Sequence, residues 1–319
     1  MKHLFIFIFL VPFIGFSQSP SLDVAKELLH KKKYSQAEDT LKAYLIESPN
    51  DIEGIELLGD AFGQQEEWDH AIECYKKLVE KQPIVANYHY KYGGALGMKA
   101  LSVSKLRAVA FIGDIKSAFL KAAELDPKHI NTRWALVELY MQLPGIIGGS
   151  KSKSLKYAEE LEALSKVDGY LAKGYIYEYD NEPELAEKYY KQAIRIGGSL
   201  TCFDKLTNLY ETQKQPDKAI ANIEEAQVMH KRNALHYQIG KVAAEYNIQL
   251  SKGEQCLQIY IQNYSAADGV PKAWAHYRLA QIQKHKGVKT EALKYIDLAI
   301  AALPEIEVFQ KEKTDILKL

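Results

Sequence analysis

The sequence predicts an all-α fold, a right-handed superhelical α-solenoid of about eight antiparallel helix pairs followed by a C-terminal capping helix. Two observations predict it. Small residues recur in pairs at a fixed distance, and apolar residues flank them at helical spacing. Prolines follow the second helix of several pairs, where no backbone N–H is needed, at Pro49, Pro83, Pro127 and Pro304.

The N-terminal residues differ in composition from the rest of the chain. Lys2 and His3 precede an apolar run from Leu4 to Phe16, and small residues lie at a cleavage-like spacing before Gln18. This pattern predicts a signal peptide over residues 1–17 and an exported protein, periplasmic or secreted. The run is shorter than the roughly 20 residues that span a bilayer, so the mature form should have no membrane span. An uncleaved membrane anchor is the alternative.

The most regular feature is the distance between the small residue of a first helix and that of the second. It is 12 positions in five pairs: Ala25 with Ala37, Gly59 with Ala71, Gly174 with Ala186, Thr207 with Ala219, and Ala280 with Ala292. A larger residue follows each second member four positions later, on the same helical face: Leu41, Tyr75, Tyr190, Ile223 and Ile296. Because helices approach to about 8–10 Å only where crossing side chains are small, this spacing predicts packed pairs.

Three further pairs need a longer connection between their helices. These connections run from Gly93 to Ile115, from Val137 to Ser154 and from Gly240 to Cys256. With them, the solenoid extends over residues 18–304 at a period of about 34. One amphipathic helix is predicted over residues 305–319, with Lys and Glu outward, and it should cap the open end of the solenoid.

One run matches a known repeat pattern of large, large, small, aromatic, then small, aromatic, apolar and proline. Its residues are Ile55, Leu58, Gly59, Phe62, Ala71, Tyr75, Leu78 and Pro83. The chain resembles the tetratricopeptide repeat family in this respect, as an exported bacterial type. The resemblance implies a protein–protein interaction scaffold whose concave surface is lined by first-helix residues.

Composition and motifs argue against several other classes of protein. The chain has 41 basic and 41 acidic side chains and no long basic run, so clustered cations for nucleic acid are lacking. No H-E-x-x-H or G-x-S-x-G motif is present, and Cys74, Cys202 and Cys256 form no C-x-x-C pair. We therefore expect a non-enzymatic protein without cofactor or metal, whose thiols are free and buried.

Two segments and one set of histidines are candidates for a binding role. Residues 144–152 are glycine-rich but lack the spacing of a phosphate loop, so tight-turn packing competes with anion binding, and Ile146 and Ile147 should tuck against adjacent helices. The insertion between Gly93 and Ile115 alternates basic and apolar residues, which fits a basic docking finger or packing under a longer loop. His89, His236 and His276 share one repeat position, which favours half-buried packing over metal ligation.

The candidate binding residues are those that the repeat places on the concave groove. They are Glu53, Glu56, Asp60, Tyr90, Trp134, Glu138, Tyr175, Asn208, Tyr237, Lys241, Trp274 and Tyr277. Rigid rings beside polar groups are typical of a protein-binding groove, which predicts a polypeptide partner in the cell envelope. Two alternatives stay open: a small-ligand or glycan-binding module that stacks sugars on the same rings, and rings that merely pack across neighbouring helices. The pattern gives no oligomeric state.

Overall fold

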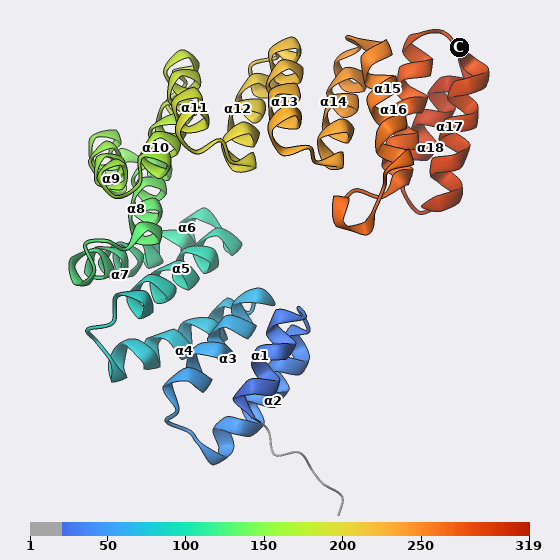
Figure 1. The fold of residues 1–319 in the computed structure, drawn as a ribbon. Coiled ribbons are helices and arrows are strands. Elements are labelled where there is room, and N and C mark those ends of the chain that lie inside the picture. Colours follow the sequence, from blue (N-terminus) through green and yellow to red (C-terminus); the bar gives the residue numbers. More distant parts are fainter. Residues whose placement is uncertain (1–20) are drawn as a thin grey trace, which may run out of the picture. The chain divides into compact units, whose positions relative to one another are not determined.

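The computed structural model describes residues 21–319, and the predicted signal peptide lies outside them. The described part is built of helices that follow one another in antiparallel pairs (Figure 1). It divides into two compact units, one ending at Leu136 and one beginning at Val137, within the helix α8. The all-α repeat fold expected from the sequence is confirmed, with eight helix pairs and a final helix.

The first unit holds α1 (Leu22–His30), α2 (Tyr34–Glu47), α3 (Ile52–Gln64), α4 (Trp68–Lys81), α5 (Ala86–Ser102), α6 (Lys105–Ala108), the 3₁₀ turn η1 (Val109–Phe111), α7 (Ile112–Leu125) and the first part of α8 (Ile130–Gln142). Its pairs are α1 with α2, α3 with α4, and α5 with α7. The longer third connection predicted from the sequence is therefore formed by α6 and η1.

The second unit holds the rest of α8, the turn η2 (Gly145–Ile147), α9 (Lys151–Leu164), α10 (Lys166–Tyr179), α11 (Pro183–Gly197), α12 (Leu200–Thr212), α13 (Pro216–His230), α14 (Asn233–Tyr246), α15 (Leu250–Gln262), the turn η3 (Ala266–Asp268), α16 (Lys272–His285), α17 (Lys289–Ala302) and α18 (Glu307–Leu317). Its pairs are α8 with α9, α10 with α11, α12 with α13, α14 with α15, and α16 with α17. Each pair from α10 onward packs on the next along the chain (Figure 1).

Small residues form the crossings, as the twelve-residue spacing predicts. Ala37 and Ala71 are fully buried, and a Cβ built on Gly59 would lie 2.7 Å from Cε1 of Tyr75. In the second unit a Cβ on Gly174 would lie less than 3.0 Å from the ring of Tyr190. These glycines are therefore required for close approach of the paired helices rather than for an unusual backbone angle.

The seventh pair corrects one assignment. A Cβ on Gly240 would collide with Leu257, and a Cβ on Gly253 would lie 2.5 Å from Cβ of Ala243. The second-helix residue at this crossing is thus Gly253, not the predicted Cys256, which is only half-buried. The sequence pattern failed here because a glycine in the first turn of a helix was read as part of the loop.

The glycine-rich connection between α8 and α9 is a tight turn. The carbonyl of Pro144 accepts hydrogen bonds from the N–H groups of Ile147 and Gly149, and Gly148 has a φ of 105°. A Cβ on Gly149 would overlap the carbonyl of Leu143, so glycine is needed there. Ile147 is half-buried, but Ile146 is 97% exposed, and the expectation that it tucks against a helix was wrong.

The last helix, α18, covers the apolar face of α16 and α17. Phe309 and Ile316 are fully buried against them. Glu312 is also buried and pairs with Lys284 at 2.5 Å, so this glutamate points inward, contrary to the expectation of Glu outward. Within residues 21–319, no helix combines the length and the apolar character needed to cross a membrane.

Candidate functional site

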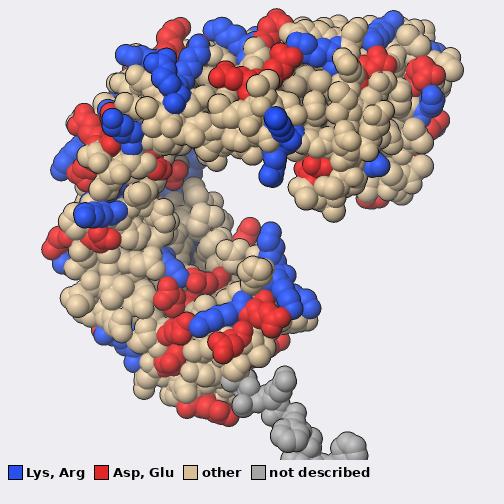
Figure 2. Space-filling view, viewed as in Figure 1, with Lys and Arg blue, Asp and Glu red and all other residues tan. Residues whose placement is uncertain are grey.

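The predicted groove residues lie on first helices, which are the N-terminal members of the helix pairs, and they occur in both units. Five belong to the first unit and seven to the second. Acidic and basic side chains intermix over the face of each unit shown in Figure 2, which agrees with the balanced composition.

The acidic residues of the first unit are engaged by lysines of neighbouring first helices. Glu53 of α3 pairs with Lys26 of α1 at 2.6 Å. Glu56 and Asp60 share Lys91 of α5, each at 2.7 Å. Tyr75 donates a hydrogen bond of 2.8 Å to Asp60. Sequence reasoning missed Lys91, although it lies 31 positions after Asp60, close to one repeat.

These contacts hold the helix pairs together and leave little negative charge for a partner. The Lys91 side chain is only 20% exposed, and the two carboxylates raise its pKa against the opposing effect of burial. Tyr90 is half-buried, with its ring 5.2 Å from that of His129, and Trp134 is half-buried as well. The first unit thus uses most of its predicted binding residues for internal packing.

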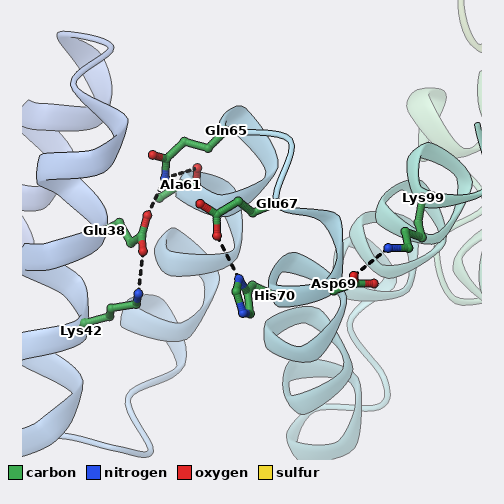
Figure 3. A network of polar contacts seen from close by, with 8 residues as sticks. All are labelled: Glu38, Lys42, Ala61, Gln65, Glu67, Asp69, His70 and Lys99. Carbon is green, nitrogen blue, oxygen red and sulfur yellow. Dashed lines mark hydrogen bonds and ion pairs between the residues drawn. The ribbon is translucent and has the colours of Figure 1, made fainter. Parts of the chain in front are cut away.

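Other polar contacts link α2 to the end of α3, and α4 to α5 (Figure 3). Glu38 accepts from Gln65 at 2.7 Å and pairs with Lys42 at 2.5 Å. His70 lies 2.9 Å from Glu67, and Lys99 pairs with Asp69 at 2.6 Å. The last of these pairs anchors the C-terminal turn of α5 to α4.

Two predicted groove rings of the second unit are core residues. Tyr237 is 8% exposed and Tyr277 is 6% exposed. The Tyr237 ring lies 5.4 Å from that of Tyr260, and the Tyr277 ring stacks on Phe309 at 5.1 Å. Trp274 is half-buried and meets Phe309 edge-on at 5.0 Å. The expectation that these rings line an open groove was wrong for Tyr237 and Tyr277, because both pack between helices.

Lys241 is also engaged within the chain. It lies 3.4 Å from Glu211 of α12 and 3.8 Å from Glu245 of its own helix α14, and Arg278 of α16 pairs with Glu245 at 2.5 Å. These ion pairs join three successive first helices. Glu245 and Arg278 did not stand out in the sequence, because either charge alone is typical of any solvated helix face.

Other first-helix side chains of the second unit are open to solvent, at least in part, and five of them are considered together. We call them the carboxylate–tyrosine surface: Glu138 of α8, Tyr175 and Tyr179 of α10, and Asp204 and Asn208 of α12. Tyr175 accepts a hydrogen bond of 3.3 Å from Gln142, and its ring lies 6.0 Å from that of Tyr179, which is 53% exposed. Tyr179 did not stand out in the sequence.

The two carboxylates of this surface are unusual. Glu138 and Asp204 reach solvent, and neither forms an ion pair within the part of the chain that the structure describes. Desolvation by surrounding atoms nevertheless raises the pKa of both. The charge of Glu138 also acts on Tyr175 and Lys205, so side chains of α8, α10 and α12 are close together there.

The histidines and cysteines show no ligand arrangement. His89 is buried with Nε2 2.8 Å from the carbonyl of Pro83, and the His276 ring stacks near Tyr295 at 6.4 Å. The expected packing role is confirmed for both. Among residues 21–319, no group of three or more His, Cys, Asp or Glu side chains is arranged to hold a metal ion.

Stacked helix pairs with small residues at each crossing define an α-solenoid repeat protein. Residues 167–196, which form most of α10 and α11, match the family model described as tetratricopeptide repeat. The chain therefore carries a tetratricopeptide repeat in this pair, and the resemblance to that family predicted from the sequence is confirmed.

The chain is also similar to a curated relative and to solved structures. Intraflagellar transport protein 70A2 from Rattus norvegicus is 30% identical over 103 residues, which is 32% of this chain and 15% of that protein. A tetratricopeptide repeat protein from Parabacteroides merdae is 12% identical, with 92% of this chain and 96% of that chain covered and a TM-score of 0.49. YrrB, described as having an unusual peptide-binding site, is 18% identical, with 62% and 98% covered and a TM-score of 0.43.

Proposed function

We propose that the chain is a non-enzymatic scaffold that binds a polypeptide segment carrying a basic side chain on its carboxylate–tyrosine surface. Solenoids of helix pairs present extended surfaces that take such segments. One observation carries the assignment to this surface. Glu138 and Asp204 are solvent-accessible carboxylates that have a raised pKa and no ion-pair partner among residues 21–319. Five other first-helix acids are paired within the chain: Glu53, Glu56, Asp60, Glu211 and Glu245.

A cationic side chain of a partner would supply the missing charge. A Lys or Arg of the partner placed beside either carboxylate would favour its ionised form, which is the form that desolvation opposes. The exposed ring of Tyr179 offers a face for the same cation. Asn208 and the Tyr175 hydroxyl would add hydrogen bonds to an extended backbone.

The test is selection of peptides from a random display library by the purified chain. We expect enrichment of Lys and Arg beside apolar residues. The variant Glu138→Gln/Asp204→Asn should bind the selected peptides about tenfold more weakly or worse, because charge-assisted contacts contribute about 1.5–3 kcal/mol each. Affinity should also fall as pH is lowered toward the raised pKa of Asp204.

A matched control separates this effect from net charge. Glu184 of α11 and Glu225 of α13 are exposed, lie on second helices of the same unit and form no ion pair there. The variant Glu184→Gln/Glu225→Gln changes the net charge by the same amount and should keep the affinity. Equal affinities of both double variants, or a library that selects no basic residue, would contradict the proposal.

We also propose that the protein acts outside the cytoplasm, in the cell envelope or the medium. The support is the sequence of residues 1–17, a basic start followed by an apolar run and small residues. N-terminal sequencing of the protein purified from the producing cell tests this proposal. An intact Met1 on cytoplasmic protein would refute it.

A further inference from the structure

The insertion between α5 and α7 carries an apolar tip that no helix of residues 21–319 covers. α5 has 17 residues where α3 has 13, and the chain then turns through Val103 and Ser104 into the short helix α6. We call the apolar tip the following six residues: Met98, Leu101, Lys105, Leu106, Arg107 and Val109. α6 packs chiefly against α5 and η1, so most of its surface faces solvent.

The exposure of the tip is large for apolar side chains. Leu106 is 86% exposed, Leu101 is 73% exposed, and Val109 and Met98 are 49% and 44% exposed. Isolated exposed apolar residues are common, but four within 12 positions of one insertion form a cluster. The alternative, in which the insertion merely packs under a longer loop, does not hold for Leu106, because this side chain is exposed.

Charge indicates what covers the cluster. Residues 99–113 contain Lys99, Lys105 and Arg107 and no acidic residue. Lys99 is held by Asp69 of α4 (Figure 3), whereas Lys105 and Arg107 form no ion pair with any residue that the structure describes. In the sequence of α6, the exposed Leu106 lies between these two cations.

We propose that the apolar tip docks on an anionic lipid bilayer. Aliphatic side chains beside unpaired cations, without acidic residues, are typical of segments that lie in a membrane interface: the apolar groups enter the acyl boundary while Lys and Arg meet lipid phosphates. A protein pocket more often takes a rigid aromatic or Arg anchor surrounded by polar groups that find partners. The tip belongs to the first unit, and its test is independent of peptide binding by the second.

The experiment is cosedimentation of the full chain with vesicles. One set is phosphatidylcholine alone, and the other contains about 30% phosphatidylglycerol, which supplies the anionic surface. We expect binding to the anionic vesicles that weakens with salt. Lys105→Gln/Arg107→Gln and Leu106→Ser/Val109→Ser should each lower the partition coefficient about tenfold or more, one by removing charge and the other by removing apolar area.

Two controls localise the effect. Ile46 and Ile84 are 82% and 80% exposed elsewhere in the first unit, and Ile46→Ser/Ile84→Ser should bind vesicles as the parent does. All proteins have the same N-terminus, so the differences between variants report the tip. Hydrogen exchange of residues 99–113 should slow with anionic vesicles and stay unchanged with neutral ones.

Three results would overturn the proposal. They are absence of anionic vesicle binding by the parent, equal binding by the parent and both tip variants, and unchanged exchange in residues 99–113. Loss of a protein partner by the tip variants, with vesicle binding intact in all of them, would assign the tip to a protein interface instead.

Discussion

The crossing of α10 and α11 offers a quantitative test of the packing. Gly174 is buried, and a Cβ at this position would lie less than 3.0 Å from the ring of Tyr190, which is itself fully buried. The Tyr190 hydroxyl donates a hydrogen bond of 2.6 Å to Glu178. Gly174→Ala therefore forces either a helix displacement or a rotation of a ring that has no free space.

Two opposing effects set the magnitude. Alanine is favoured over glycine in a helix by about 1 kcal/mol. Against this, inserting a methyl into a filled crossing costs about 1–3 kcal/mol, and displacing Tyr190 from Glu178 weakens a hydrogen bond to a charged group worth about 1.5–3 kcal/mol. We expect a net destabilisation of about 1–3 kcal/mol. Gly94→Ala in α5, where a Cβ meets nothing within 4 Å, should stabilise by about 0.5–1 kcal/mol.

Urea unfolding followed by circular dichroism, with hydrogen exchange of α10 and α11, measures both variants. Exchange is needed because repeat chains often unfold in parts. The chain itself suggests a rescue: where the first-helix residue is Ala25 or Ala280, the residue facing it is Leu41 or Ile296 rather than a ring. Combining Gly174→Ala with Tyr190→Leu should cost less than the sum of the two changes. A Gly174→Ala protein as stable as Gly94→Ala would refute the steric argument.

Three further predictions follow from buried and paired groups. Lys91→Met should destabilise the first unit by about 1–3 kcal/mol, because it leaves Glu56 and Asp60 unpaired. In the control Lys121→Met, the ion pair that is lost is exposed, and urea unfolding should show a cost below about 1 kcal/mol. Burial lowers the pKa of His276 from its ordinary 6.5, so the unfolded chain takes up the proton at a higher pH than the folded chain. The stability should therefore fall as the pH drops below 6.5, and it should fall less in His276→Gln. Thermal melts at several pH values measure this difference. Burial raises the pKa of Cys74 to about 11. A thiol reagent at about pH 8 should therefore label this thiol at least tenfold more slowly in the folded chain than in denaturant. Rapid labelling of the folded protein would contradict the burial of Cys74.

Much of the fold was predictable because the repeat is a local steric rule. The spacing between Gly59 and Ala71 places two small residues at one crossing, and the position of Tyr75 follows from the helical period. The rule failed at Gly240, where the connection is one residue longer and the true partner is Gly253. A change of one residue in a loop shifts the helix face, and the sequence gives no independent measure of that length.

The candidate site was less predictable, since repeat position fixes a helix face but not what covers it. Tyr237 and Tyr277 occupy groove positions, yet Tyr260 and Phe309 of following helices bury their rings. Asp60 also occupies a groove position, and its charge is neutralised by Lys91. Both outcomes depend on side chains about one repeat away, whose reach across the stack is not encoded in either helix alone.

The sequence by itself determined the helix pairs, their small-residue crossings and the presence of an irregular third connection, because these follow from helical period and side-chain size. Tertiary structure decided which polar groups remain available. Stacking brings the first helices close enough to pair most of their charges, and it leaves Asp204 desolvated without a counter-ion and Leu106 uncovered. We expect partners at the unpaired Asp204 carboxylate and at the exposed Leu106 side chain. Binding at these two places would neutralise a charge and bury an apolar surface that folding leaves exposed.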